Sequence, residues 1–249
     1  MWELKEKDGL KYFNLKSEFP IRLIFTTRQG GFSQGEYKSF NLSFEVGEEK
    51  KVVEKNYQKL KEVLGTKKII TLKQTHSDKI VFVKGETFEE GDALLTKEKG
   101  LYLGVKVADC LAVAFFNKES DLIGIAHFGW RNLLLGFPKK ICQILKEMTD
   151  SPLFYLLFPS IRGECYEIGE EVFSAFQKAY PENYQEFLWD KASRYYLDLR
   201  GLARSLLAGE GLKEYSSLEY CVHCQGDLFY SKRRDGKTGR NLALIGLQV

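Results

Sequence analysis

This chain has no long apolar run and no large excess of charge of either sign. None of its 249 residues falls in an apolar run of the ~18 residues that a membrane span needs, and the first residues lack the apolar core of a signal peptide. Lys+Arg 37 against Asp+Glu 34 leaves a net charge of +3, too balanced to indicate nucleic-acid binding. We therefore expect a cytoplasmic protein with no membrane or nucleic-acid partner.

Cysteine is scarce and odd in number, which excludes a fully paired disulfide framework. Five cysteines without a secretion signal favour reduced thiols. Cys142 falls in a helical pattern, where a small buried hydrophobe is expected. Cys221 and Cys224 flank His223 in C-V-H-C, which is half of a zinc knuckle, but no second pair along the sequence completes it. A buried or incidental pair is the favoured interpretation, with a metal role as the alternative.

The chain also lacks linkers, repeats and low-complexity segments, so one α/β domain over residues 1–249 is predicted. Strands are expected to outnumber helices. The first twenty residues are expected to pair as edge strands, and the segment from Asp227, D-L-F-Y-S-K-R-R-D-G-K-T-G-R, is read as a strand followed by a basic turn. Strands are predicted at 21–26, 68–72, 79–83, 101–107 and 153–158, with two central strands between 107 and 131, and helices at 52–64, 141–148, 170–180 and 199–207.

Histidine, which can bind a metal or transfer a proton, occurs three times in the whole chain. His127 ends an apolar strand, Cys110 ends the preceding strand, and His76 lies in a tight connection between two further strands. Two imidazoles and one thiolate would hold a metal with one open coordination position, as a catalytic zinc requires. A hydroxide on such a zinc could attack C6 of a purine, although the deaminase motif H-x-E is absent.

Other roles for these residues stay open. Cys110 could act as a nucleophile with a histidine base and Asp109 nearby, as in a cysteine hydrolase. Arg28 ends a strand before a glycine-rich loop and could bind an anion, although a solvated arginine is an equal alternative.

Several motifs, in order, resemble the YfiH/laccase-domain family. They are T-R-Q-G-G-F-S, S-F-N-L with Asn41, Q-T-H-S, G-D-A-L-L-T, V-A-D-C-L-A-V, I-A-H-F-G-W-R, Y-E-I-G and the terminal S-K-R-R-D-G-K-T-G-R. The resemblance spans nearly the whole chain. Phe128, Asn132 and Lys232 depart from the family pattern, which puts substrate preference in question without removing a proposed ligand.

This resemblance implies a layered α/β/β/α fold with mixed sheets and a metal held by His76, Cys110 and His127, which would also be the catalytic residues. It implies phosphorolysis of adenosine, inosine and methylthioadenosine together with adenosine deamination, with zinc as the expected ion and copper possible in its place. Phenol oxidation with copper in the same site is an alternative activity, as is a cysteine hydrolase acting on a small amide or cell-wall precursor. Nucleosides and phosphate would be the partners. The candidate substrate or phosphate ligands are Arg28, Asn41, Asp109, Arg131, Arg233, Arg234 and Arg240.

Overall fold

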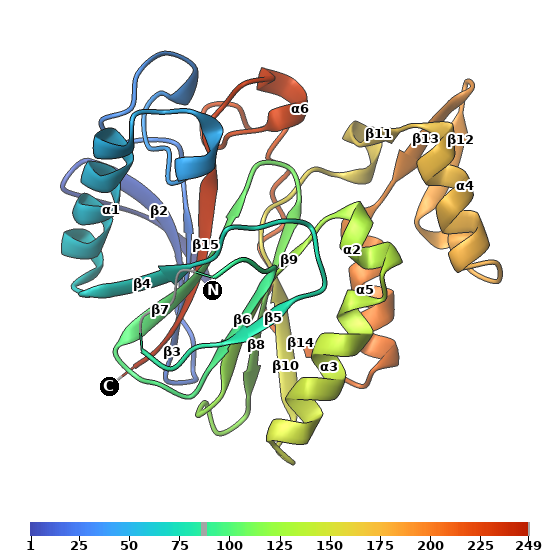
Figure 1. Cartoon of the computed structure of the whole chain (residues 1–249), viewed down its shortest axis with the longest axis horizontal. Helices are drawn as coiled ribbons and strands as arrows, with labels where there is room; N and C mark the ends of the chain where they lie inside the picture. Colours follow the sequence, from blue (N-terminus) through green and yellow to red (C-terminus); the bar gives the residue numbers. More distant parts are fainter. Residues whose placement is uncertain (86–88, 249) are drawn as a thin grey trace.

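The computed structural model describes residues 1–85 and 89–248, and its core is a pair of mixed six-stranded sheets. The sheets face each other in the middle of the molecule, with helices outside both (Figure 1). The first sheet contains, in spatial order, β1 (Trp2–Lys7), β2 (Leu10–Leu15), β3 (Ile21–Thr26), β15 (Asn241–Leu247), β7 (Leu101–Val107) and β4 (Lys68–Thr71). The second contains β14 (Lys213–Glu214), β10 (Leu153–Leu157), β8 (Leu111–Asn117), β9 (Ile123–Phe128), β6 (Ala93–Thr96) and β5 (Ile80–Phe82).

Alternation along the strands divides the apolar side chains among three cores. In β8, Ala112, Ala114 and Phe116 pack between the two sheets, whereas Val113 and Phe115 pack on the opposite face against helices. Successive strand residues point to opposite faces, so a strand buried on both faces reads as one continuous apolar run. The mixed α/β layering expected from the sequence is therefore confirmed.

Helices cover the outer face of each sheet. The helix α1 (Lys50–Leu64) packs on the first sheet through a stripe that includes Val53, Tyr57 and Leu60. The second sheet is covered by α2 (Trp130–Leu134), α3 (Phe137–Met148) and α5 (Leu199–Gly209), and α4 (Glu170–Ala179) packs beside α2. The helix α4 lies at one end of the molecule with a small antiparallel sheet of β11 (Glu167–Ile168), β13 (Arg194–Leu197) and β12 (Leu188–Lys191) (Figure 1).

The predicted strand after Asp227 is wrong. The backbone there turns, and Ser231 then caps the short helix α6 (Lys232–Asp235) by accepting from the N–H of Arg234. The side chain of Asn241 binds both the N–H and the carbonyl of Tyr230, at 3.1 and 3.0 Å. This segment therefore satisfies its backbone through a side chain instead of a strand partner.

Short 3₁₀ helices complete the described structure, and their bounds are η1 Gly35–Tyr37, η2 Phe44–Val46, η3 Gly163–Cys165 and η4 Tyr184–Glu186. Among the described residues, no helix combines the length and apolar character needed to cross a bilayer.

The packing between the sheets generates the first testable prediction. Phe116 is fully buried there, with Phe19, Phe154 and Tyr215 rings at 5.2 to 5.3 Å. We expect Phe116→Ala to lower the free energy of unfolding by about 3–5 kcal/mol, because it removes apolar contacts and leaves a cavity. Phe82→Ala, at a side chain that is 41% exposed, should cost less than about 1 kcal/mol. Equal losses for the two variants in urea titrations would contradict this account of the core.

Candidate metal centre

Three potential metal ligands converge from separate elements. His76 lies in the loop between β4 and β5, Cys110 in the turn between β7 and β8, and His127 near the end of β9. Their donor atoms all lie within 4.8 Å of one another, and the two imidazole centroids are 4.7 Å apart. Because β7 belongs to the first sheet and β8 to the second, the Cys110 turn joins the two sheets beside the histidines.

Asp92, just before β6, orients both histidines. Its Oδ1 is 2.8 Å from Nδ1 of His127, an arrangement that leaves Nε2 of His127 available to a metal. The same carboxylate accepts the backbone N–H of Thr75, His76 and Ser77 and the hydroxyl of Ser77. Asp92 is 1% exposed, so one buried group positions ligands from two elements. It was not among the residues predicted from the sequence, although it lies in the G-D-A-L-L-T segment.

The geometry of His76 fits a metal ligand. Its backbone φ is +58°, in the left-handed region that non-glycine residues adopt rarely. Its Nδ1 is buried and has no hydrogen-bond partner in the part of the chain that the structure describes. Gly129 leaves room beside this ring, since a Cβ there would lie 2.7 Å from Nδ1 of His76 and 3.4 Å from Sγ of Cys110.

The pKa values of the two histidines move in opposite directions. Burial, followed by repulsion from His127, lowers the pKa of His76 to about 4, so its ring is neutral at pH 7. Burial also disfavours the charged form of His127, but attraction to Cys110 and hydrogen bonding to Asp92 outweigh this effect and raise its pKa to about 9. A bound cation would reverse the balance at His127, because it competes directly with the proton.

The three donors open onto a hollow of about 240 Å³. Its wall carries positive charge that the sequence analysis had only partly identified, since Lys106 and Lys232 join Arg240 there. Lys106 is 6% exposed, and its Nζ lies 2.7 Å from Glu45. The other lining residues are Ser43, Glu45, Val46, Gln74, Val107 and Ala108.

A larger hollow of about 650 Å³ lies between α1 and β4 and shares Glu45 and Lys106 with the first. The ion pair between these two residues therefore stands between the metal ligands and the larger hollow. Lys106 stands in the otherwise apolar run of β7, which is the one local sign that it differs from a solvated lysine.

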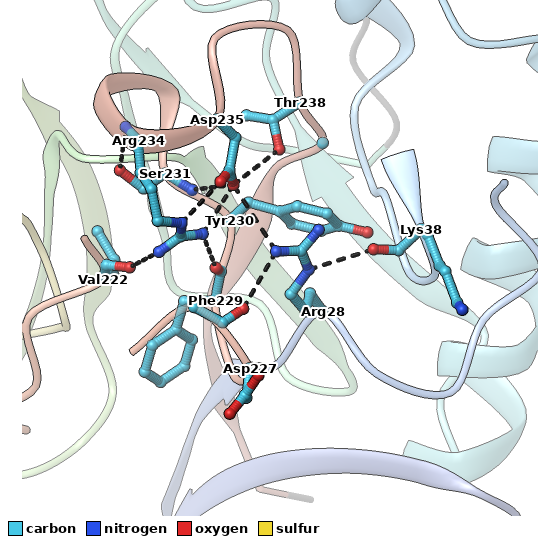
Figure 2. Close-up of polar contacts among 12 residues, drawn as sticks. Arg28, Lys38, Val222, Asp227, Phe229, Tyr230, Ser231, Arg234, Asp235 and Thr238 are labelled. Atoms are coloured by element: carbon cyan, nitrogen blue, oxygen red, sulfur yellow. Dashed lines mark hydrogen bonds and ion pairs between the residues drawn. The ribbon is translucent and has the colours of Figure 1, made fainter. Parts of the chain in front are cut away.

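The five predicted arginines have three different environments. Arg28 and Arg234 both pair with Asp235, approaching it from two sides (Figure 2). Arg28 also donates to the carbonyls of Lys38 and Gly226, and Arg234 to three further carbonyls. The guanidinium groups of Arg131 and Arg233 make no such ion pair within residues 1–85 and 89–248 but lie over aromatic rings, at 4.2 Å from Trp130 and 5.3 Å from Tyr166, as that of Arg28 also does at 4.7 Å from Tyr230. Among the residues that the structure describes, Arg240 is the one predicted arginine that lines the hollow beside the metal ligands.

Asn41 and Asp109 hold the loops around the site. Asn41 accepts the N–H of Arg240 at 3.0 Å. Asp109, with φ of +102°, accepts the hydroxyl of Ser231 at 2.5 Å and the N–H of Arg233 at 2.6 Å. Burial raises the pKa of Asp109, opposed by these hydrogen bonds. Asn41 thereby ties the residue before β15 to the loop that carries Ser43, and Asp109 ties the start of α6 to the turn that carries Cys110.

The departures from the family pattern also have visible consequences. Asn132 donates to the carbonyl of His127 at 2.7 Å and accepts from the N–H of Gly129 at 2.8 Å, so it fixes the backbone on both sides of Phe128. Phe128 packs in the helix-covered core, away from the ligands, whereas Lys232 faces the hollow.

Comparison with known proteins places this arrangement in a family. The family model described as multi-copper polyphenol oxidoreductase laccase matches residues 22–248. The chain belongs to this laccase family. The resemblance to the YfiH/laccase-domain proteins expected from the sequence is therefore confirmed.

Relatives of the laccase family are similar over most of the chain. The purine nucleoside phosphorylase of Deinococcus radiodurans is 35% identical over 228 residues, covering 90% of this chain and 88% of that protein. The purine nucleoside phosphorylase YfiH of Escherichia coli is 30% identical and covers 89% and 92% of the two chains. The crystal structure of YlmD from Geobacillus stearothermophilus superposes with a TM-score of 0.89 at 27% identity, covering 99% of each chain.

The carboxylate behind His127 generates a second prediction. We expect Asp92→Asn to weaken zinc binding by about 10–100-fold, because the neutral amide loses the charge that supports His127 and some of the acceptors for the His76 loop. Competition with a chromogenic chelator measures this affinity. The exposed Asp150→Asn serves as the control and should bind zinc as the unmodified protein does.

Gly129 generates a third prediction. A methyl group at Gly129 would collide with the His76 ring, so Gly129→Ala should weaken zinc affinity at least about 10-fold in the same titration. Gly209→Ala is the matched control, since a Cβ there meets no atom within 4 Å. Unchanged affinity in Gly129→Ala would show that the space beside His76 does not matter.

Proposed function

We propose that this chain is a purine nucleoside phosphorylase that uses a zinc ion held by His76, Cys110 and His127. The observation that carries this proposal is the convergence of three soft or borderline donors, backed by Asp92, on a hollow with a cationic wall. Two imidazoles and a thiolate suit zinc and leave one position open. The names of the relatives supply the substrate class, purine nucleosides with phosphate.

The chain's own residues supply most of what phosphorolysis needs. In this reaction a phosphate oxygen forms a bond to C1′ of the ribose as the bond from C1′ to the base breaks, and the bonding electron pair leaves with the base. Arg240, Lys106 and Lys232 line the hollow and can hold the phosphate by charge. When bound, the metal supplies a Lewis acid that polarises an atom of the purine or ribose.

The proposal covers several nucleosides and a second reaction. We propose adenosine, inosine and methylthioadenosine as substrates. We also propose adenosine deamination, in which water adds at C6 of the purine and the amino group leaves from C6 as ammonia. The five free cysteines fit a reducing compartment, so we also propose a cytoplasmic location. Copper in the same three donors is the alternative ion. A multicopper centre built on imidazoles is excluded, because the chain has three histidines.

A second candidate function has a specific observation in its favour. Cys110 lies beside His127, whose Nδ1 binds Asp92, which is the order nucleophile, base and orienting acid of a cysteine hydrolase. Asp92 takes the orienting position that the sequence analysis had associated with Asp109. In this mechanism His76 would have no direct chemical role.

Loss of a ligand distinguishes the two functions and is the fourth prediction. We expect His76→Ala and Cys110→Ser each to lower kcat/KM for phosphate-dependent release of base from inosine and adenosine by at least about 100-fold. Cys142→Ala, at a cysteine in the helix-covered core, should retain activity. Chelation should abolish the activity, and added zinc should restore it.

Retention of full activity in His76→Ala, or after complete removal of metal, would overturn the zinc assignment. Covalent labelling of Cys110 by a substrate in metal-free protein, detected by mass spectrometry, would instead support the cysteine hydrolase.

A further inference from the structure

Three cysteine sulfurs form a second cluster, separate from the metal centre described above. Cys165 ends η3, whereas Cys221 and Cys224 lie in the turn that precedes α6. The three Sγ atoms lie within 4.8 Å of one another, and those of Cys165 and Cys224 are 3.5 Å apart, without a disulfide bond. The C-V-H-C segment, which has no second pair of ligands near it in the sequence, is thus joined in the structure by the thiol of Cys165 from a distant segment.

The backbone around Cys221 is arranged to stabilise a thiolate. Its Sγ accepts the N–H of Arg162 at 3.4 Å and also faces the N–H groups of His223 and Cys224. A sulfur that accepts several N–H groups is favoured as a negatively charged ligand. In a C-x-x-C turn these bonds also direct both sulfurs to the same side.

The two segments that carry the cysteines are fixed relative to each other. Ser160 and Cys221 form an isolated parallel bridge, and the N–H of Val222 donates to the carbonyl of Ser160 at 3.1 Å. On the other side, Arg234 donates to the carbonyls of Val222 and His223, each at 2.8 Å. Figure 2 shows Arg234 held by Asp235 as it reaches Val222. The donors are therefore preorganised, and binding a ligand requires little ordering of the chain.

We propose that Cys165, Cys221 and Cys224 form a second metal site, which binds a thiophilic divalent ion, Zn²⁺, independently of the site at His76, Cys110 and His127. Thiolates are preferred ligands of zinc, and three of them leave one position for water or another ligand. Cys221 is buried and Cys224 is exposed, so the open position faces solvent.

An ion in this second site would be linked to the turn that carries Cys110 by a short chain of contacts. Cys165 precedes Tyr166, whose ring lies 5.3 Å from the guanidinium of Arg233. The N–H of Arg233 in turn binds Asp109, the residue before Cys110. The proposed ion would thus join the segments that carry Tyr166 and Arg233.

Metal stoichiometry in variants that disable one site at a time tests the proposal. Protein purified under reductant, stripped of metal and reloaded with zinc should bind two ions per chain, one for each cluster. Cys110→Ser and Cys224→Ser should each reduce this number to one, and the double variant should bind none. Cys142→Ser is the matched control and should retain both ions.

Cobalt(II) identifies the donors and keeps the second site distinguishable from the proposed function. In Cys110→Ser, cobalt should give the strong near-ultraviolet charge-transfer absorption of several thiolates, whereas in Cys224→Ser only the weaker band of one thiolate should remain. The first result holds whether or not the chain is a phosphorylase, because it depends on the second cluster alone. Equal zinc content in Cys224→Ser and the unmodified protein would overturn the proposal, as would metal-free Cys110→Ser after reloading.

A measurement on the unmodified protein covers the case in which a cysteine variant fails to fold. Zinc should slow alkylation of Cys165 and Cys224 by at least about 10-fold, because only the free thiolate reacts. Peptide mass spectrometry with and without zinc measures this protection. Equal alkylation rates, or a Cys165–Cys224 disulfide in the reduced and reloaded protein, would exclude the site.

Discussion

The carboxylate of Asp92 is the group on which the geometry of the metal centre depends. It joins the loop that carries His76 to the strand that carries His127, through three backbone N–H groups, two hydroxyls and one imidazole. The carboxylate stays charged although it is buried. Burial raises its pKa, but the hydrogen bonds that it accepts lower the pKa by more, so that it lies below the ordinary value. The left-handed backbone of His76 is maintained by the same contacts.

The two-sheet architecture explains why the site lies where it does. The turn between β7 and β8 crosses from one sheet to the other, and Cys110 sits in this crossing. The cores on either side are filled by apolar side chains whose positions are set by strand alternation. The donors are consequently held on a rigid frame, while β7, α6 and the residue before β15 supply the cationic wall.

Sequence reasoning selected three side chains that the structure brings together, but it did not find the residues that surround them. His76, Cys110 and His127 could be proposed because histidine is rare and each of the three stands beside a strand end. Asp92 was missed because the direction of its side chain depends on a loop 16 residues upstream in the chain. The engagement of Arg28 and Arg234 by backbone carbonyls was equally inaccessible, since those carbonyls belong to irregular segments. Cys165 could not be assigned to Cys221 and Cys224 because the spacing of 59 residues carries no local signal.

Strand prediction shows the same division. The buried runs at Ile21–Thr26 and Leu101–Val107 were predicted as observed, because continuous apolar character reflects burial on both faces. The strand Asn241–Leu247 has the same continuous apolar character but was not predicted from the sequence. The hairpin Leu188–Leu197 is half exposed and irregular in pattern, so its strands gave little signal.

The position of β15 determines the order in which the molecule can be assembled during translation. This strand lies between β3 and β7, pairing with both, yet it is synthesised more than a hundred residues after either of them. The ribosome must therefore release Asn241–Leu247 before the two halves of the first sheet can meet. Until then the edges of β3 and β7 stay open to pairing with other chains, so the unfinished chain is most exposed to aggregation just before its last strand docks.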